Sequence, residues 1–98
     1  MQIWTQAEAQ SVENVDFLYF YTPLCGTCHL ATQMLEIVEA TQKFDGYAIN
    51  LNHFPEFAQV FQVEQVPCLI SLKTQAKLYT FANVVNLYNF CQTQLKTK

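Results

Sequence analysis

The stretch Phe17-Leu18-Tyr19-Phe20-Tyr21 runs through Thr22-Pro23-Leu24 into Cys25-Gly26-Thr27-Cys28. A continuous apolar and aromatic run is typical of a strand buried on both faces, and Pro23 ends it because proline has no N–H to donate. Two thiols separated by two residues can close a small disulfide when both lie on the first turn of a helix. Unpaired N–H groups and the positive end of the helix dipole lower a thiol pKa there, so the pattern indicates a dithiol redox centre.

Two other interpretations of this cysteine pair stay open. The thiols are either buried structural cysteines or half of a zinc site. A four-cysteine zinc site needs a second close pair, and the two remaining cysteines, Cys68 and Cys91, are far apart in the sequence. The redox interpretation is therefore preferred.

The composition indicates a single folded domain spanning residues 1–98, large enough for one core. A hydrophobic fraction of 51% with 13% charged residues argues against disorder. Five basic against eight acidic residues give a mild net charge of −3 without a Lys/Arg cluster. Nucleic acid is therefore excluded as an expected partner, because no basic patch would bind a phosphate backbone.

The start of the chain, Met1-Gln2-Ile3-Trp4-Thr5-Gln6, has no basic region followed by an apolar one, so it does not have the pattern of a signal peptide. No apolar run approaches the roughly 20 residues that span a bilayer. We therefore expect a cytoplasmic protein without membrane contact. In that compartment a cysteine pair is more often catalytic than structural.

The order of predicted elements indicates an α/β fold with a mixed central sheet and helices on both faces. Thr5 and Glu8 fit a capping box, which predicts a short helix through about Asn14. Asn83 is expected to cap the last helix, whose apolar stripe includes Cys91. The remaining predictions are strands at 1–4, 16–22, 47–51, 68–72 and 78–81, helices at 25–41 and after Pro55, and a polar hairpin loop at 73–77.

Over essentially its whole length the chain resembles a small thioredoxin-like protein. The resemblance rests on the strand Phe17–Tyr21 leading into the Cys25–Cys28 motif, and on Gln65-Val66-Pro67 before the strand at 68–72. It implies the thioredoxin fold, with Pro67 in the cis form beside the dithiol. Cys25 would be the exposed attacking thiolate and Cys28 the buried resolving thiol. Substrate contacts are expected from Val66, Pro67, Cys68, Gly26 and Thr27, with the backbone around Val66 binding an extended peptide.

The departures from the family pattern are informative. Tyr19 stands where a typical thioredoxin has a buried Asp, and Ala48 where its Lys partner is expected. Both halves of the acid–base pair are thus missing together, which removes the usual proton acceptor for the resolving thiol. Leu24 replaces a Trp, Thr27 replaces a Pro, and Cys68 stands where a Thr is usual.

Several residues have competing interpretations. His29 either holds a proton near the dithiol, since an ordinary imidazole has a pKa of about 6.5, or only points to solvent. Cys91 is expected to be an inert core thiol. Cys68 is either a third redox sulfur beside the dithiol or a small buried hydrophobe. We expect the Cys68 thiol to face the dithiol beside Pro67 but to stay shielded and reduced when mild oxidation forms the Cys25–Cys28 bond.

These observations predict a thiol–disulfide oxidoreductase that reduces protein disulfides without a bound cofactor. A flavin-dependent thioredoxin reductase or another dithiol donor would regenerate it. One alternative is a thioredoxin-fold binding module with little turnover. Another is a metal or iron–sulfur carrier using Cys25, Cys28 and Cys68.

Overall fold

A computed structural model describes residues 1–3 and 15–96 of the chain. The helix predicted between Thr5 and Asn14 lies outside the described residues. Within the described part, no helix has the length and apolar character needed to cross a membrane.

The described elements follow the predicted order closely. They are β1 (Gln2–Ile3), β2 (Phe17–Tyr21), α1 (Gly26–Thr41), β3 (Gly46–Asn50), α2 (Glu56–Val60), β4 (Cys68–Ser71), β5 (Lys77–Leu78) and α3 (Val84–Lys96).

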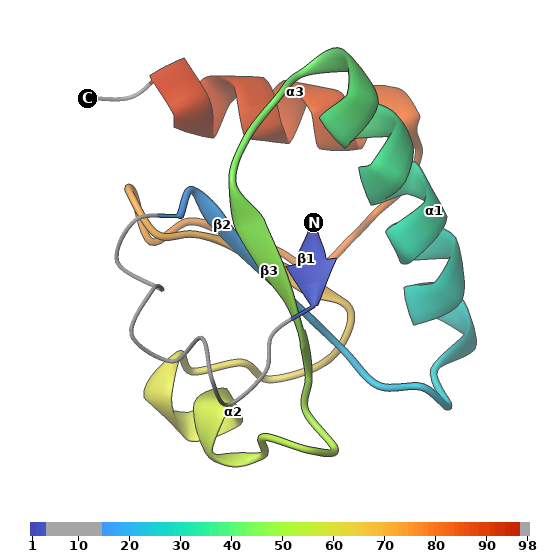
Figure 1. The fold of residues 1–98 in the computed structure, drawn as a ribbon, viewed down its shortest axis with the longest axis vertical. Coiled ribbons are helices and arrows are strands. Elements are labelled where there is room, and N and C mark those ends of the chain that lie inside the picture. Colours follow the sequence, from blue (N-terminus) through green and yellow to red (C-terminus); the bar gives the residue numbers. More distant parts are fainter. Residues whose placement is uncertain (4–14, 97–98) are drawn as a thin grey trace.

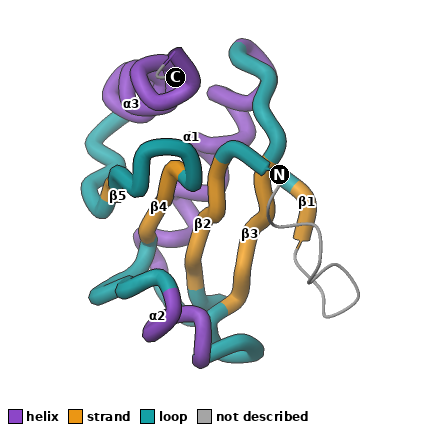
Figure 2. The backbone as a smooth tube through the Cα atoms, turned by 90° about the vertical axis from the view of Figure 1, so that its left-hand side faces the viewer, coloured by secondary structure: helices purple, strands orange, loops and turns teal. Residues whose placement is uncertain are grey.

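The strands form one sheet in the order β1-β3-β2-β4-β5 (Figure 2). The strands β1, β3 and β2 pair in parallel, whereas β4 runs antiparallel to β2 and β5 antiparallel to β4. The central position of β2 explains its sequence, because a strand with neighbours on both edges and helices over its faces has no solvent-facing side. The predicted mixed sheet with helices on both faces is confirmed.

Two hydrophobic clusters lie on opposite faces of the sheet. Alternate residues of β2 divide between them, since successive side chains of a strand point to opposite faces. Phe17 and Tyr19 pack with buried residues of α1 and α3; in Figure 1, α3 runs along the top of the molecule and α1 down its right-hand side. Leu18 and Phe20 pack on the other face, toward Phe57 and Phe61 around α2.

The last helix begins as the sequence indicates. The Asn83 side-chain oxygen accepts a hydrogen bond from the Asn86 N–H at 2.7 Å, which satisfies one of the free donors at the start of α3. Leu87 and Cys91 are fully buried, and the half-buried Val84, Tyr88 and Leu95 pack around them. The predicted apolar stripe is therefore the face that α3 turns to the core.

The hairpin after β4 is shorter than predicted, and the expected strand at 78–81 is wrong in its bounds. Ser71 N–H already bonds to the Ala76 carbonyl at 2.9 Å, and Gln75 has a φ of 69°. This left-handed residue closes the turn early, so β5 starts at Lys77 and pairs Leu78 with Leu69. Residues 79–81 lie beyond the strand.

Candidate active site

The dithiol lies where a central strand meets a helix. After β2 ends at Tyr21, a tight turn brings the Cys25 N–H to the Thr22 carbonyl at 3.3 Å. Cys25 has extended backbone angles (φ −93°, ψ 111°) and occupies the N-cap position of α1. Both cysteines thus lie on the first turn of the helix, as predicted.

The Cys25 sulfur caps the helix in place of the usual Ser, Thr or Asp oxygen. It accepts the Cys28 N–H at 3.1 Å and lies 3.3 Å from the Thr27 hydroxyl oxygen. Burial alone would raise the pKa of Cys25. Hydrogen bonds from the Cys28 and Thr27 side chains, and from their backbone N–H groups, outweigh burial and lower the Cys25 pKa below its ordinary value.

The two thiols differ sharply in exposure and acidity. Cys25 is half-buried, whereas Cys28 is 2% exposed. Burial, followed by the hydrogen bond to the Cys25 sulfur, raises the pKa of Cys28 to about 12. The pair therefore consists of an accessible thiol that ionises more readily than an ordinary cysteine and a shielded thiol that stays protonated at neutral pH.

The other residues expected to contact substrate lie at the same end of the sheet. Cys68 pairs with Phe20, so Pro67 is close to the end of β2 from which the chain enters the dithiol turn. The Val66–Pro67 peptide bond is cis, the isomer that the family resemblance implies. Val66 is half-buried and Pro67 buried, while Gly26 and Thr27 are exposed.

The expectation that the Cys68 thiol faces the dithiol is wrong. Its side chain is 0% exposed and belongs to the cluster on the α2 face, together with Phe20 and Ile70. The register with Phe20 decides this, because directly paired residues share a face of the sheet. Burial raises the pKa of Cys68 to about 11, so the thiol stays protonated. Its side chain has no surface to offer a substrate.

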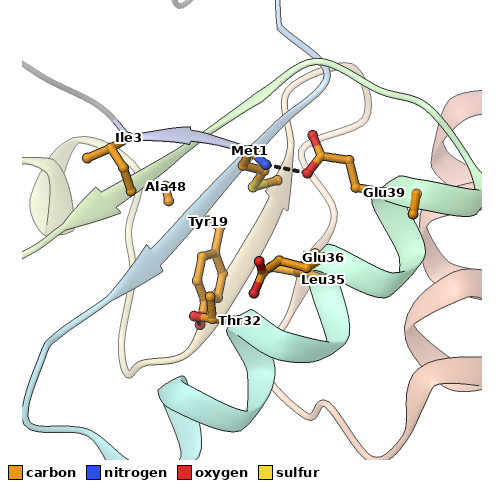
Figure 3. Close-up of a pocket in the computed structure, with 9 residues that line it drawn as sticks. Met1, Ile3, Tyr19, Thr32, Leu35, Glu36, Glu39 and Ala48 are labelled. Carbon is orange, nitrogen blue, oxygen red and sulfur yellow. Dashed lines mark hydrogen bonds and ion pairs between the residues drawn. The ribbon is translucent and has the colours of Figure 1, made fainter.

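Tyr19 and Ala48, which replace the missing acid–base pair, are paired across β2 and β3. The Tyr19 hydroxyl donates to the Cys28 carbonyl at 2.9 Å and lies 3.1 Å from the Thr32 hydroxyl oxygen, which donates to the same carbonyl at 2.9 Å. Figure 3 shows the Tyr19 ring reaching from β2 to Thr32 on α1. Burial raises the pKa of Tyr19 far above its ordinary value, so the phenol is no base at neutral pH.

The sequence patterns above do not indicate a role for Thr32, although its spacing from Cys28 is a signal. It follows Cys28 by one helical turn, and residues four apart share a helix face. A hydroxyl in this position can reach the carbonyl one turn back, as it does here. Tyr19 and Thr32 together join the first turn of α1 to the centre of the sheet.

A cavity of about 240 Å³ opens beside the dithiol on the α1 face of the sheet. Its lining includes Cys25 and Cys28, and also Tyr19, Thr32 and His29. The described lining carries no carboxylate, and His29 supplies its only imidazole. His29, the histidine that the sequence places near the site, therefore lines the space next to Cys28, and it is exposed.

The described residues do not form a cluster of side chains that could bind a metal ion. No group of three or more His, Cys, Asp or Glu side chains within residues 1–3 and 15–96 could hold a metal ion. Cys68 lies on the far face of the sheet from the Tyr19–Thr32 contact at Cys28. The three-cysteine set of the metal-carrier alternative is not assembled in this part of the chain.

Comparison with known proteins agrees with this geometry. Residues 4–93 match the family model described as Thioredoxin, and the chain belongs to the thioredoxin family. The family and the site support a role of the thiol–disulfide oxidoreductase type. Over 80 residues the chain is 41% identical to thioredoxin-like protein YusE of Bacillus subtilis (strain 168), covering 78% of this chain and 76% of that protein.

Solved structures confirm the fold. A mutant thioredoxin from Halobacterium salinarum NRC-1 has a TM-score of 0.81 at 17% identity, covering 100% of this chain and 92% of the other. Thioredoxin 1 from Thermosipho africanus TCF52B has a TM-score of 0.68 at 17% identity, covering 82% and 93%. At these identities the likeness shows the thioredoxin fold alone.

A first prediction concerns the hydrogen bond between the Thr27 hydroxyl and the Cys25 sulfur. Thr27→Val keeps the shape of the side chain but removes the hydroxyl, so the Cys25 pKa should rise toward its ordinary value. Iodoacetamide alkylation of the reduced protein across pH measures this. The alkylation rate at neutral pH should fall, with the half-maximal rate moving to higher pH.

Thr41→Val is the matched control, since its hydroxyl donates to the Val38 carbonyl at the other end of α1 and contacts no sulfur. Its alkylation profile should match the wild-type profile. Equal reactivity of Cys25 and Cys28 in the wild type, or an unchanged profile in Thr27→Val, would contradict the assignment of the hydrogen bonds as the cause of the Cys25 acidity.

Proposed function

We propose that this protein reduces disulfide bonds of other proteins through Cys25 and Cys28. The observation that supports the proposal most strongly is the unequal pair at the start of α1. Cys25 is accessible and its pKa is lowered, while Cys28 is buried with a pKa of about 12. Attack by one thiol and later resolution by the other require this difference.

The reaction transfers two electrons from the dithiol to the substrate. The Cys25 thiolate attacks one sulfur of the substrate disulfide, forming a mixed disulfide and releasing the first substrate thiolate. Cys28 then loses its proton and attacks the Cys25 sulfur. The Cys25–Cys28 bond forms, and the second substrate thiolate leaves and takes up a proton.

Substrate binding in this proposal uses the surface around Cys25. The backbone at Val66, held next to Pro67, pairs with an extended substrate segment as an added strand would. Gly26 and Thr27 are exposed beside the nucleophile, and Leu24 is 94% exposed directly before it. The exposed apolar side chain of Leu24 favours substrates with an apolar residue near the disulfide. Cys68, being buried, contributes no contact of its own.

Turnover requires an external reductant for the Cys25–Cys28 disulfide. A thioredoxin reductase or another dithiol donor would supply the two electrons, and the dithiol chemistry itself needs no resident cofactor. Such a cycle fits the cytoplasm, where glutathione and thioredoxin systems keep thiols reduced.

Trapping the mixed disulfide tests this proposal. Cys28→Ser removes the resolving thiol, so substrate should remain bonded to Cys25, and Cys25→Ser should abolish the reduction of insulin disulfides. Cys91→Ala removes a buried thiol on α3, outside the site, and serves as the matched control with activity near the wild-type level. The measurements are the insulin reduction rate with dithiothreitol as donor and non-reducing electrophoresis of the trapped species.

A wild-type protein that binds substrate but reduces no disulfide would contradict the proposal and favour the binding-module alternative. Loss of reduction in Cys91→Ala equal to that in Cys25→Ser would also contradict it.

The missing carboxylate leads to a prediction about pH. Burial, the largest cause of the raised Cys28 pKa, persists when Cys25 is bonded to substrate, and the described cavity lining carries no carboxylate, so we expect the proton of Cys28 to leave to solvent. The thiolate fraction then rises about tenfold per pH unit between about pH 7 and pH 9, because the solution stays below that pKa. The rate of mixed-disulfide resolution, followed by stopped-flow tryptophan or substrate fluorescence, should rise in the same proportion.

His29→Ala should leave this slope unchanged, since water is the acceptor. A plateau near neutral pH that disappears in His29→Ala would instead identify the imidazole as the proton acceptor.

A further inference from the structure

The chain between α2 and β4, residues 61–67, is held by two side chains from the hairpin beyond β4. This segment, called the 61–67 loop below, ends at Val66 and Pro67. The Lys77 ammonium donates to the Gln62 carbonyl at 2.8 Å, and the Tyr79 hydroxyl accepts the Glu64 N–H at 3.2 Å. Both bonds join residues fifteen apart in the sequence, so the loop is held by a segment that is distant from it in the chain.

The alternation of side chains along the hairpin explains why these two residues reach the same loop. Successive side chains of an extended chain point to opposite faces. Leu78 packs with the cluster of α1 and α3, whereas Tyr79 packs with the cluster on the α2 face. Lys77, on the other side of Leu78, shares the face of Tyr79 and extends toward the loop.

Tyr79 has a second partner at the end of the loop. Its hydroxyl interacts with the thiol of Cys68, the residue that follows Pro67, and this interaction lowers the pKa of Cys68 while it raises the pKa of Tyr79. That thiol is fully buried among Leu18, Phe20 and Ile70. One phenol therefore accepts a hydrogen bond from the middle of the 61–67 loop and interacts with the first residue of β4.

We infer that Tyr79 is a positioning residue for substrate binding: its hydroxyl, which accepts the Glu64 N–H, holds the 61–67 loop so that Val66 presents its backbone to a substrate peptide. The inference rests on the proposed function, in which that backbone pairs with the substrate. A strand-like contact needs its N–H and C=O groups fixed in advance, because ordering them during binding costs affinity. Cys68 thus helps to position Tyr79 from within the α2-face cluster and does not act as a third redox sulfur.

The contacts of the Tyr79 hydroxyl should affect substrate affinity but not the acidity of Cys25. Tyr79 belongs to the α2-face cluster, whereas the hydrogen bonds that set the Cys25 pKa all come from Thr27 and Cys28. Removing the Tyr79 hydroxyl leaves the ring packing intact but deprives the Glu64 N–H and the Cys68 thiol of their partner. Affinity for a peptide substrate should suffer, while the acidity of Cys25 should not.

The experiment compares Tyr79→Phe with wild type on two substrates. Insulin presents a peptide backbone to Val66, whereas hydroxyethyl disulfide has none. For insulin, Tyr79→Phe should raise KM about fivefold with kcat unchanged, the effect of losing one hydrogen bond of ordinary net strength. The rate with hydroxyethyl disulfide, the Cys25 alkylation profile and the reduction potential against glutathione should stay at wild-type values.

Two further variants sharpen the comparison. Tyr88→Phe changes a half-buried tyrosine on α3, on the opposite face of the sheet, and should behave as wild type in every assay. Lys77→Met removes the bond to Gln62 and should raise the insulin KM in the same direction, while Lys77→Arg should restore it. An insulin KM unchanged in Tyr79→Phe, or an equal loss on both substrates, would overturn the inference.

Hydrogen exchange supplies a readout that does not depend on activity. The amides of residues 62–66 should exchange faster in Tyr79→Phe than in wild type or Tyr88→Phe. Unchanged exchange would overturn the positioning role even if the wild-type protein reduces both substrates. A wild-type protein that reduces neither substrate would overturn the proposed function instead, and the exchange rates alone would then decide whether Tyr79 holds the loop.

Discussion

The contact on which the site depends is the hydrogen bond from the Cys28 N–H to the Cys25 sulfur. The first N–H groups of any helix lack partners within the helix and favour negative charge nearby. Here the Cys25 sulfur takes the capping position. This one atom is both the acceptor that the helix needs and the nucleophile whose pKa the hydrogen bond lowers. The same turn brings Cys28 into the interior, where burial has the opposite effect on its pKa.

The sheet separates the four cysteines into distinct environments. Cys91 lies in the cluster with α1 and α3, and Cys68 in the cluster on the α2 face, each fully buried with a raised pKa. The dithiol lies at the end of β2, where the chain leaves the sheet and enters α1. Because burial keeps the other two thiols protonated, reactivity concentrates at Cys25 without any charged residue in the described lining of the neighbouring cavity.

Much of this arrangement follows from local sequence signals. The apolar run of β2, the cysteine spacing and the Asn83 cap each act over a few residues. The strand, the position of both cysteines at the start of α1 and the cap of α3 agree with the structure. The face on which Cys68 lies does not follow from such a signal, because it depends on the register of β4 against β2. The same holds for Tyr79, whose two partners are separated from it in sequence and meet it only when the hairpin folds against the 61–67 loop. The early start of β5 depends on one left-handed residue, Gln75, which no composition rule would have indicated.

The central claim is that only Cys25 and Cys28 are redox partners, and disulfide mapping tests it most directly. The reduced protein would be oxidised with a small excess of oxidised glutathione, the remaining thiols alkylated under denaturing conditions, and the peptides identified by mass spectrometry. The account predicts a single Cys25–Cys28 disulfide, with Cys68 and Cys91 recovered as alkylated thiols. A dominant bond from either member of the dithiol to Cys68 would contradict it, since that result would require the buried thiol to cross from the α2 face of the sheet to the site.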